Sequence, residues 1–69
     1  MTNTALLQEK IKASGLKLEY LADLLGITRQ ALGNKISGRN AFNQYEVGIL
    51  CRALDITTFK DICAIFFAQ

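Results

Sequence analysis

The sequence contains no histidine, no proline and no tryptophan, and it has only two cysteines among its 69 residues. The absence of histidine removes the commonest general base of enzymes and leaves Cys51 without a partner that could activate it as a nucleophile. Without histidine or a third cysteine, an ordinary zinc site is not expected. No glycine-rich phosphate loop and no carboxylate pair in an evident cleft is present, so the sequence indicates neither an enzyme nor a bound cofactor.

The sequence also shows no targeting signal. Residues 1–10 lack a positive region followed by an apolar region, and no apolar run approaches the ~20 residues that a membrane-spanning helix needs. Cys51 and Cys63 lie in apolar segments with helical spacing, and we interpret them as buried thiols in a reducing compartment. We therefore expect a soluble, cytoplasmic protein without a membrane partner.

The composition favours one small helical domain that spans residues 1–69. Hydrophobic residues make up 51% of the chain and charged residues 20%, which indicates a folded core and not a disordered chain. The absence of proline and the presence of only five glycines suit helices joined by short loops.

Apolar residues recur at helical spacing in five segments. We expect helices at about residues 4–13, 17–25, 29–37 and 44–54, and a last helix that begins near residue 57 or 58. The expected N-caps are Thr4, Thr28 and Asn43. Gly15, Gly26 and Gly38 are expected to end the first three helices, because glycine readily adopts the left-handed conformation of a helix C-terminus.

The net charge is only +2, but the charges are unevenly distributed. No acidic residue lies between Leu24 and Tyr45, whereas Arg29, Lys35 and Arg39 fall within this stretch. A locally basic stretch on a nearly neutral domain is typical of a nucleic-acid surface. On charge alone, a solvated helix face that happens to be basic is an equally good explanation.

Residues 18–38, LEYLADLLGITRQALGNKISG, carry the most informative pattern. In a tight two-helix unit the helices cross at ~90–120°, so the first helix needs a small residue for close approach, and Ala22 meets this need. Gly26 supplies a turn residue without a Cβ, and Ile27 and Leu32 anchor the second helix onto the first. The alternative is an ordinary α-hairpin in which the small residues serve packing alone.

The outward face of the second helix in this unit carries amides and a guanidinium but no carboxylate. Arginine can form bidentate bonds to guanine, and glutamine or asparagine to adenine, in the major groove of double-stranded DNA. A carboxylate there would be repelled by the phosphate backbone. Gly33 costs ~1 kcal/mol relative to alanine in a helix interior, which indicates either close approach of another molecule or neutral drift at an exposed position.

The pattern LADLLGIT, followed by a helix that ends in ISG, resembles the phage-repressor and Cro type of helix-turn-helix regulators. The resemblance extends over nearly the whole chain. It implies an all-α bundle of about five short helices, as in the DNA-binding domain of lambda repressor, with the helix-turn-helix at about residues 17–37. It also implies a small transcriptional regulator, such as a repressor, in the cytoplasm of a bacterial or phage-infected host cell.

The resemblance assigns roles to particular residues. Residues at the start of the recognition helix and one turn further along read bases, which here implies Arg29, Gln30 and Asn34. Residues at the leading cap and beyond the end of that helix touch phosphates, which implies Thr28, Ser37, Arg39, Asn40 and Asn43.

Two positions depart from the family pattern. Leu18 stands where the family often has a glutamine that contacts phosphate, so Lys17 becomes the nearest candidate donor. Lys35 stands where the family usually has an aliphatic residue. Ile36 then takes the core role, and Lys35 is expected to be partly exposed and to contact a phosphate of the DNA backbone. The first departure and the low net charge favour an alternative function, in which an adaptor or anti-repressor keeps the fold without binding DNA.

The family resemblance also implies a homodimer on a palindromic operator, with half-sites about one helical turn, ~34 Å, apart. Residues 62–67 are apolar nearly all round, which is wider than one core-facing stripe requires. We expect Ile65, Phe66 and Phe67 to contribute to a dimer surface. The alternative is that this last helix packs all of its faces over a small core.

Overall fold

The computed structural model describes residues 1–68, and these form five α-helices and no β-strand. The helices are α1 (Thr4–Ser14), α2 (Leu18–Leu25), α3 (Arg29–Ile36), α4 (Gln44–Ala53) and α5 (Phe59–Phe66). The predicted all-α fold with five helices is confirmed, and the predicted boundaries lie within two residues of the observed ones. No helix in the described part of the chain is long and apolar enough to cross a membrane.

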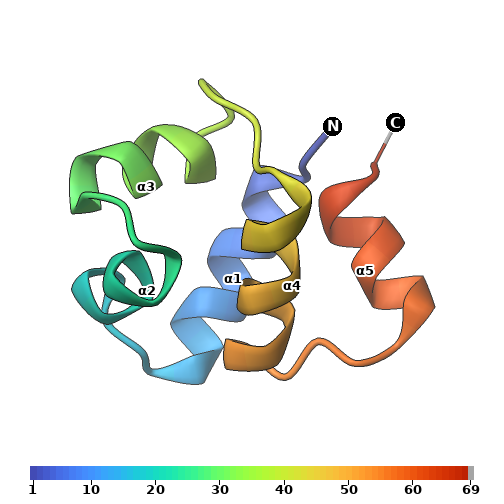
Figure 1. The fold of residues 1–69 in the computed structure, drawn as a ribbon. Helices are drawn as coiled ribbons and strands as arrows, with labels where there is room; N and C mark the ends of the chain where they lie inside the picture. The colour runs from blue at the N-terminus through green and yellow to red at the C-terminus, as the bar shows by residue number, and fades with distance from the viewer. Residues whose placement is uncertain (69) are drawn as a thin grey trace.

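The core is built from every helix. One side chain from each, namely Leu7, Leu21, Leu32, Leu50 and Ile65, is fully buried. Burial of a side chain of this size contributes roughly 1.5–3 kcal/mol to folding. Figure 1 shows α1 and α4 in the middle of the molecule, with α2 and α3 on one side and α5 on the other. This arrangement leaves the outer face of α3 free of other helices.

The turn between α2 and α3 forms as the sequence predicts. Gly26 adopts a left-handed conformation with φ 71°. Its N–H donates to the carbonyl of Asp23 at 3.1 Å, and the N–H of Ile27 donates to the carbonyl of Ala22 at 3.1 Å. Ala22 is only 2% exposed and belongs to the buried core, and α2 packs on both α3 and α4. The small residue and the glycine therefore serve the roles expected of them.

The N-cap of α1 is Asn3, and the prediction of Thr4 was wrong by one residue. The Asn3 Oδ1 accepts a hydrogen bond from the N–H of Leu6 at 3.1 Å. The backbone N–H of Asn3 donates to the carbonyl of Ile65 at 2.6 Å. This bond to α5 fixes Asn3 in an extended conformation just before the helix, so Thr4 becomes the first helical residue.

The structure corrects the prediction for the last helix. Ile65 is fully buried and cannot contribute to a surface patch. Phe66 is 4% exposed and reaches the surface only as part of the wall of a hollow, whereas Phe67 is 61% exposed. The Phe66 ring packs edge-on against Phe42, with 5.9 Å between ring centroids. This packing explains part of the wide apolar surface of α5, because the helix contacts both the central core and the segment that precedes α4.

The two cysteines, Cys51 and Cys63, are free thiols and both are half-buried. Burial raises the pKa of the Cys51 thiol above its ordinary value. A raised pKa lowers the fraction of reactive thiolate at neutral pH.

Candidate nucleic-acid interface

Helix α3 turns one face to the core and the opposite face to solvent. Leu32 and Ile36, four residues apart, are buried and hold the helix in place. Gln30, Gly33, Asn34 and Ser37 follow the spacing i, i+3, i+4, i+7 and therefore share the other face. No acidic side chain belongs to α3. The expected ridge is present and is not covered by the other helices.

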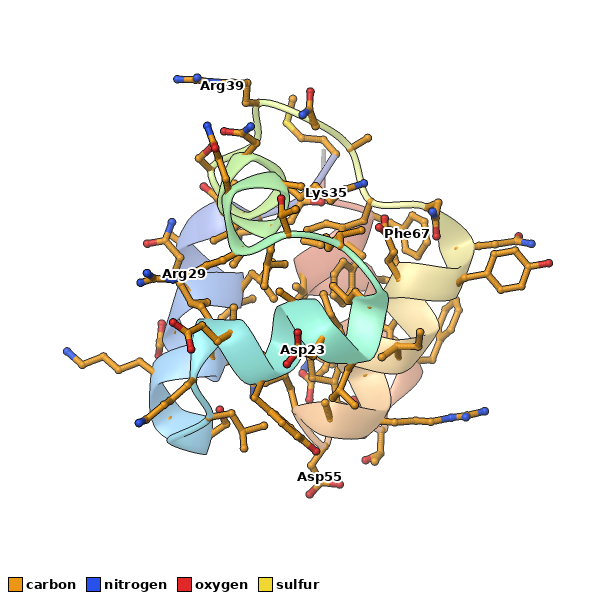
Figure 2. All side chains as sticks on the ribbon, turned by 60° about the vertical axis from the view of Figure 1, so that its left-hand side comes forward. Asp23, Arg29, Lys35, Arg39, Asp55 and Phe67 are labelled. Carbon is orange, nitrogen blue, oxygen red and sulfur yellow. The ribbon has the colours of Figure 1, made fainter. Side chains whose placement is uncertain are left out.

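The residues expected to read bases lie at the start of this face. Arg29 and Gln30 are exposed in the first turn, and Asn34 is half-buried one turn later. Figure 2 shows the guanidinium of Arg29 extending away from the body of the molecule. Within residues 1–68 the only ion pair joins Lys35 to Glu46, so the Arg29 guanidinium forms no ion pair with a carboxylate of this part of the chain. Its donors are therefore available to an external acceptor.

The end of α3 holds the segment that follows it. The carbonyl oxygen of Asn34 accepts hydrogen bonds from the N–H of Arg39 at 2.9 Å and of Asn40 at 3.1 Å. The Ser37 hydroxyl donates to the same carbonyl at 3.1 Å. Gly38 makes this reversal possible with φ 86°, in the left-handed region. As a result Arg39 projects outward beyond the end of α3 (Figure 2).

The predicted N-caps of α3 and α4, Thr28 and Asn43, are both confirmed. The Thr28 Oγ1 accepts from the N–H of Ala31 at 3.0 Å, and the Asn43 Oδ1 accepts from the N–H of Glu46 at 2.9 Å. In each cap the side-chain oxygen accepts a backbone N–H. Among residues 1–68, no acceptor engages the hydroxyl proton of Thr28 or the amide protons of Asn43, so these can donate outward. Helix N-termini also attract phosphate through their partial positive charge.

Lys35 has internal partners that the sequence analysis did not identify. Its Nζ lies 2.9 Å from the Glu46 Oε1 and 3.1 Å from the carbonyl oxygen of Ala41. The Lys35 side chain is 18% exposed and that of Glu46 is 7% exposed. The expectation of partial exposure agrees with the structure, but the amino group points to the α4 terminus. The capping-box spacing Asn43-x-x-Glu46 is the signal that could have revealed the buried carboxylate.

Glu46 is held in its charged form. Burial raises the pKa of its carboxyl group, but the hydrogen bond from the backbone N–H of Asn43 and the adjacent Lys35 ammonium together outweigh burial and lower the pKa below its ordinary value. The same Oε1 accepts the Asn43 N–H at 2.9 Å. The carboxylate is therefore the acceptor that joins α3 to the start of α4.

The start of α2 lies beside the start of α3. Lys17, Leu18, Glu19 and Arg29 line a shallow hollow of about 290 Å³. This places Lys17 near Arg29 at the start of α3. It also brings the exposed Glu19 carboxylate next to the basic surface, although Glu19 lies outside the acid-free stretch of the sequence. The crossing of helices in a helix-turn-helix is what juxtaposes these two N-termini.

The fold and the exposed ridge together define a small helical DNA-binding domain. A family model described as helix-turn-helix (HTH_3) matches residues 7–60, well over half of the chain. The chain belongs to this family, the helix-turn-helix regulators of the phage-repressor and Cro type. Members of the family are DNA-binding regulators and not enzymes. Comparisons with curated proteins and with solved structures return no match.

Proposed function

We propose that this protein is a sequence-specific transcriptional regulator, repressor- or Cro-like, that inserts α3 into the major groove of double-stranded DNA. The observation that carries the proposal is the exposed, carboxylate-free face of α3 opposite the buried pair Leu32 and Ile36. In this arrangement Arg29, Gln30 and Asn34 contact base edges. An arginine suits guanine and the two amides suit adenine.

Phosphate contacts flank this ridge. Thr28 and Asn43 donate from the two helix N-termini, and Arg39 and Asn40 donate from the exposed segment between α3 and α4. Lys17 adds a cation beside Arg29. Ser37 contributes its hydroxyl by rotating away from the Asn34 carbonyl, to which it donates in the free protein. The Lys35 ammonium is excluded from this set because Glu46 and Ala41 engage it.

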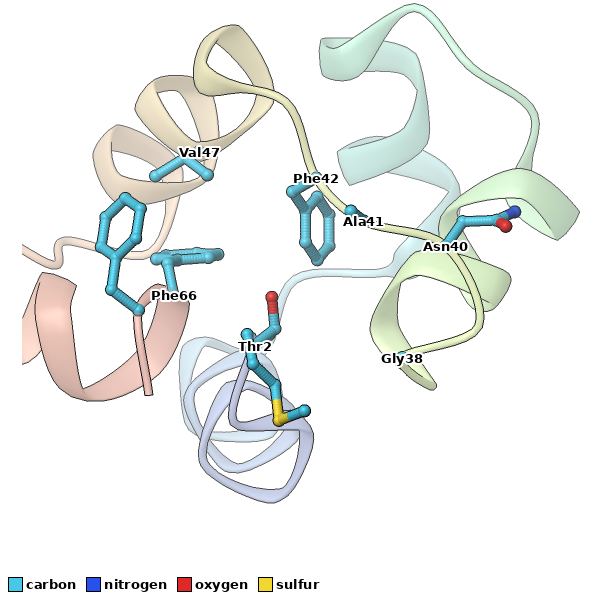
Figure 3. Close-up of a pocket in the computed structure, with 9 residues that line it drawn as sticks. Thr2, Gly38, Asn40, Ala41, Phe42, Val47 and Phe66 are labelled. Atoms are coloured by element: carbon cyan, nitrogen blue, oxygen red, sulfur yellow. The ribbon is translucent and has the colours of Figure 1, made fainter. Parts of the chain in front are cut away.

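The regulator acts as a homodimer on a palindromic operator, since one such small domain makes few contacts with DNA. With Ile65 and Phe66 buried, the dimer contact is reassigned to Phe67 and the hollow beside it. This hollow, of about 440 Å³, is lined by Met1, Phe42, Val47, Phe66 and Phe67 among others (Figure 3). The exposed Phe67 ring of each protomer packs on the apolar side of its partner's hollow.

A second candidate is an adaptor or anti-repressor that keeps the fold without binding DNA. The specific observation in its favour is the position of Glu19 and Leu18. They place a carboxylate and an apolar side chain next to Arg29, where a polar phosphate clamp would serve a DNA-binding protein better.

Salt-dependent DNA binding separates the two candidates. A duplex is first selected from a random pool, and its affinity is then measured at increasing salt. A regulator that touches many phosphates loses ~10³-fold or more affinity between about 50 and 200 mM salt. Arg29→Ala costs roughly 1–3 kcal/mol and relaxes base choice at one position. Lys60→Ala, on the distant helix α5, is the control for loss of a positive charge. Absence of binding, or binding indifferent to salt, supports the adaptor.

We propose further that residues 1–69 form one DNA-binding domain without catalytic activity or cofactor. The setting is the cytoplasm of a bacterial or phage-infected host cell, where such an operator would be available. Membership of a DNA-binding regulator family supports the assignment of a DNA-binding domain.

A further inference from the structure

The segment 37–43 between α3 and α4 carries residues assigned to phosphate contact, but little of it is packed against the core. Residues 37–41 are all exposed. Its start is held by the Asn34 carbonyl, which accepts the N–H groups of Arg39 and Asn40. Its end is held by the capping box of Asn43 and Glu46. The position of residues 37–41 therefore depends on a small number of polar bonds, and within the segment Phe42 adds apolar packing against the core.

Lys35 connects the middle of this segment to both helices. From the last turn of α3 its Nζ reaches the carbonyl of Ala41 at 3.1 Å and the Glu46 Oε1 at 2.9 Å. The same carboxylate oxygen accepts the Asn43 N–H at 2.9 Å. The Phe42 ring lies beneath, with its centroid 6.0 Å from the ammonium. One ammonium and one carboxylate thus tie residues 41 and 43 to the recognition helix.

We propose that the Lys35–Glu46 ion pair positions the segment 37–43 for phosphate contact, and that Lys35 acts on DNA through this pair and not by touching a phosphate. The inference rests on the proposed function. Its basis is burial, because the Glu46 side chain is only 7% exposed. If Lys35 swung out to a phosphate, Glu46 would remain buried without its cation, which is strongly unfavourable. Lys35 is a positioning residue, and Arg39 and Asn40 are the contacts it positions.

The two possible roles of Lys35 predict opposite signs for Glu46→Gln. If Lys35 touched phosphate directly, removing the neighbouring carboxylate would release the ammonium and tighten DNA binding. If the pair positions the segment, the same change weakens binding although it removes a negative charge from a DNA-binding surface. Glutamine at position 46 still accepts the Asn43 N–H, so the start of α4 is preserved.

The experiment measures affinity for the selected duplex with Lys35→Met, Glu46→Gln and the double variant. Lys35→Met weakens binding about tenfold, the size of one lost charge-assisted bond. Glu46→Gln weakens it by about threefold, because a neutral acceptor bonds the ammonium less strongly. The double variant binds no more weakly than Lys35→Met alone. Asp55→Asn, which removes a carboxylate at the other end of α4, is the matched control and leaves binding unchanged. Tighter binding by Glu46→Gln, or additive effects in the double variant, overturns the proposal.

A second readout needs no DNA and guards against misfolding. Lys35→Met alone leaves a buried carboxylate unpaired and can unfold the domain, whereas the double variant leaves none. In the double variant, hydrogen exchange at the amides of Arg39 and Asn40 accelerates about tenfold. Exchange at the amide of Leu54, bonded to the Leu50 carbonyl at 2.8 Å, stays unchanged. Unchanged exchange at Arg39 and Asn40 overturns the proposal. If the wild type binds no duplex, the proposed function fails, and this measurement still decides whether the ion pair holds the segment.

Discussion

Gly26 and Asp55 occupy equivalent positions, each just after the last turn of a helix and each in the left-handed region, with φ 71° and 56°. The hydrogen bonds around them match. The N–H of Ile56 donates to the carbonyl of Cys51 at 2.8 Å, as that of Ile27 does to Ala22 at 3.1 Å. Of the two, only Asp55 carries a Cβ, which makes this conformation unfavourable for it.

Asp55→Gly is therefore expected to stabilise the protein. The substitution removes the Cβ penalty, and the greater flexibility of glycine in the unfolded chain offsets part of the gain, for a net increase of up to about 1 kcal/mol in the free energy of unfolding. Urea denaturation measures this change. Asp55→Asn is the control, because asparagine tolerates the left-handed region and removes only the charge at the C-terminus of α4. A less stable glycine variant would contradict the interpretation.

The features that the sequence predicted well are local ones. The turn of Ala22, Gly26 and Ile27 depends on residues within one short segment, and its spacing is set by helix geometry. The caps Thr28 and Asn43 are likewise identified by the three residues that follow each of them. Such features need no knowledge of the remaining chain.

Features that depend on the path of the chain were not predictable. Glu46 lies eleven residues from Lys35, and only the course of the intervening segment brings them together. The burial of Phe66 depends on Phe42, which arrives from the same segment. An apolar helix face in the sequence indicates that the face is buried. It does not indicate whether the same chain or a second copy of it buries that face.

Stability is expected to fall in acid because of Glu46. Its pKa in the folded protein lies below the ordinary value of 4.5, so the unfolded chain binds a proton first as the pH falls. The stabilisation is fully present above pH 4.5 and is lost as the pH falls from there through the lowered folded-state pKa. Urea denaturation between pH 7 and pH 3, with wild type and Glu46→Gln compared, measures it. The stabilities of the two proteins converge in acid, and parallel curves would contradict the prediction.

Glu19→Gln is expected to tighten DNA binding a few-fold at low salt. The exposed carboxylate lines the same hollow as Lys17 and Arg29, so it weakens the attraction of that surface for phosphate. The gain diminishes as salt rises, because exposed charges are screened. Asp55→Asn, with the same change of charge at the far end of α4, serves as the comparison. Equal effects of the two substitutions would show that net charge alone matters.

Phe67→Ser is expected to shift the protein from dimer to monomer in sedimentation equilibrium. Phe67 is 61% exposed beside the hollow assigned to the dimer contact. Binding to a single half-site is unchanged, whereas binding to the palindrome weakens. Phe59→Ser removes an 81% exposed aromatic side chain from the other end of α5 and is the matched control. If Phe59→Ser dissociates the dimer and Phe67→Ser does not, the contact lies elsewhere.

Gly33→Ala distinguishes the two explanations of this glycine. A Cβ at Gly33 meets no atom of residues 1–68 within 4 Å, so packing within that part of the chain does not require glycine here. Alanine should raise the free energy of unfolding by about 1 kcal/mol through helix propensity. It should also weaken DNA binding, because the methyl group stands on the face of Gln30 and Asn34 that we propose enters the groove.

Gly48→Ala is the matched control for this prediction. Gly48 lies within α4, where a Cβ likewise meets nothing within 4 Å in the described part of the chain. The same gain in stability is therefore expected, with no change in DNA affinity. Stability by urea denaturation and affinity for the selected duplex are measured on both variants. If both become more stable and both keep their affinity, Gly33 reflects neutral drift, and close approach of the α3 backbone to DNA is ruled out. If only Gly33→Ala loses affinity, close approach of the α3 backbone to DNA explains why a glycine that lowers the stability of the helix stands at this position.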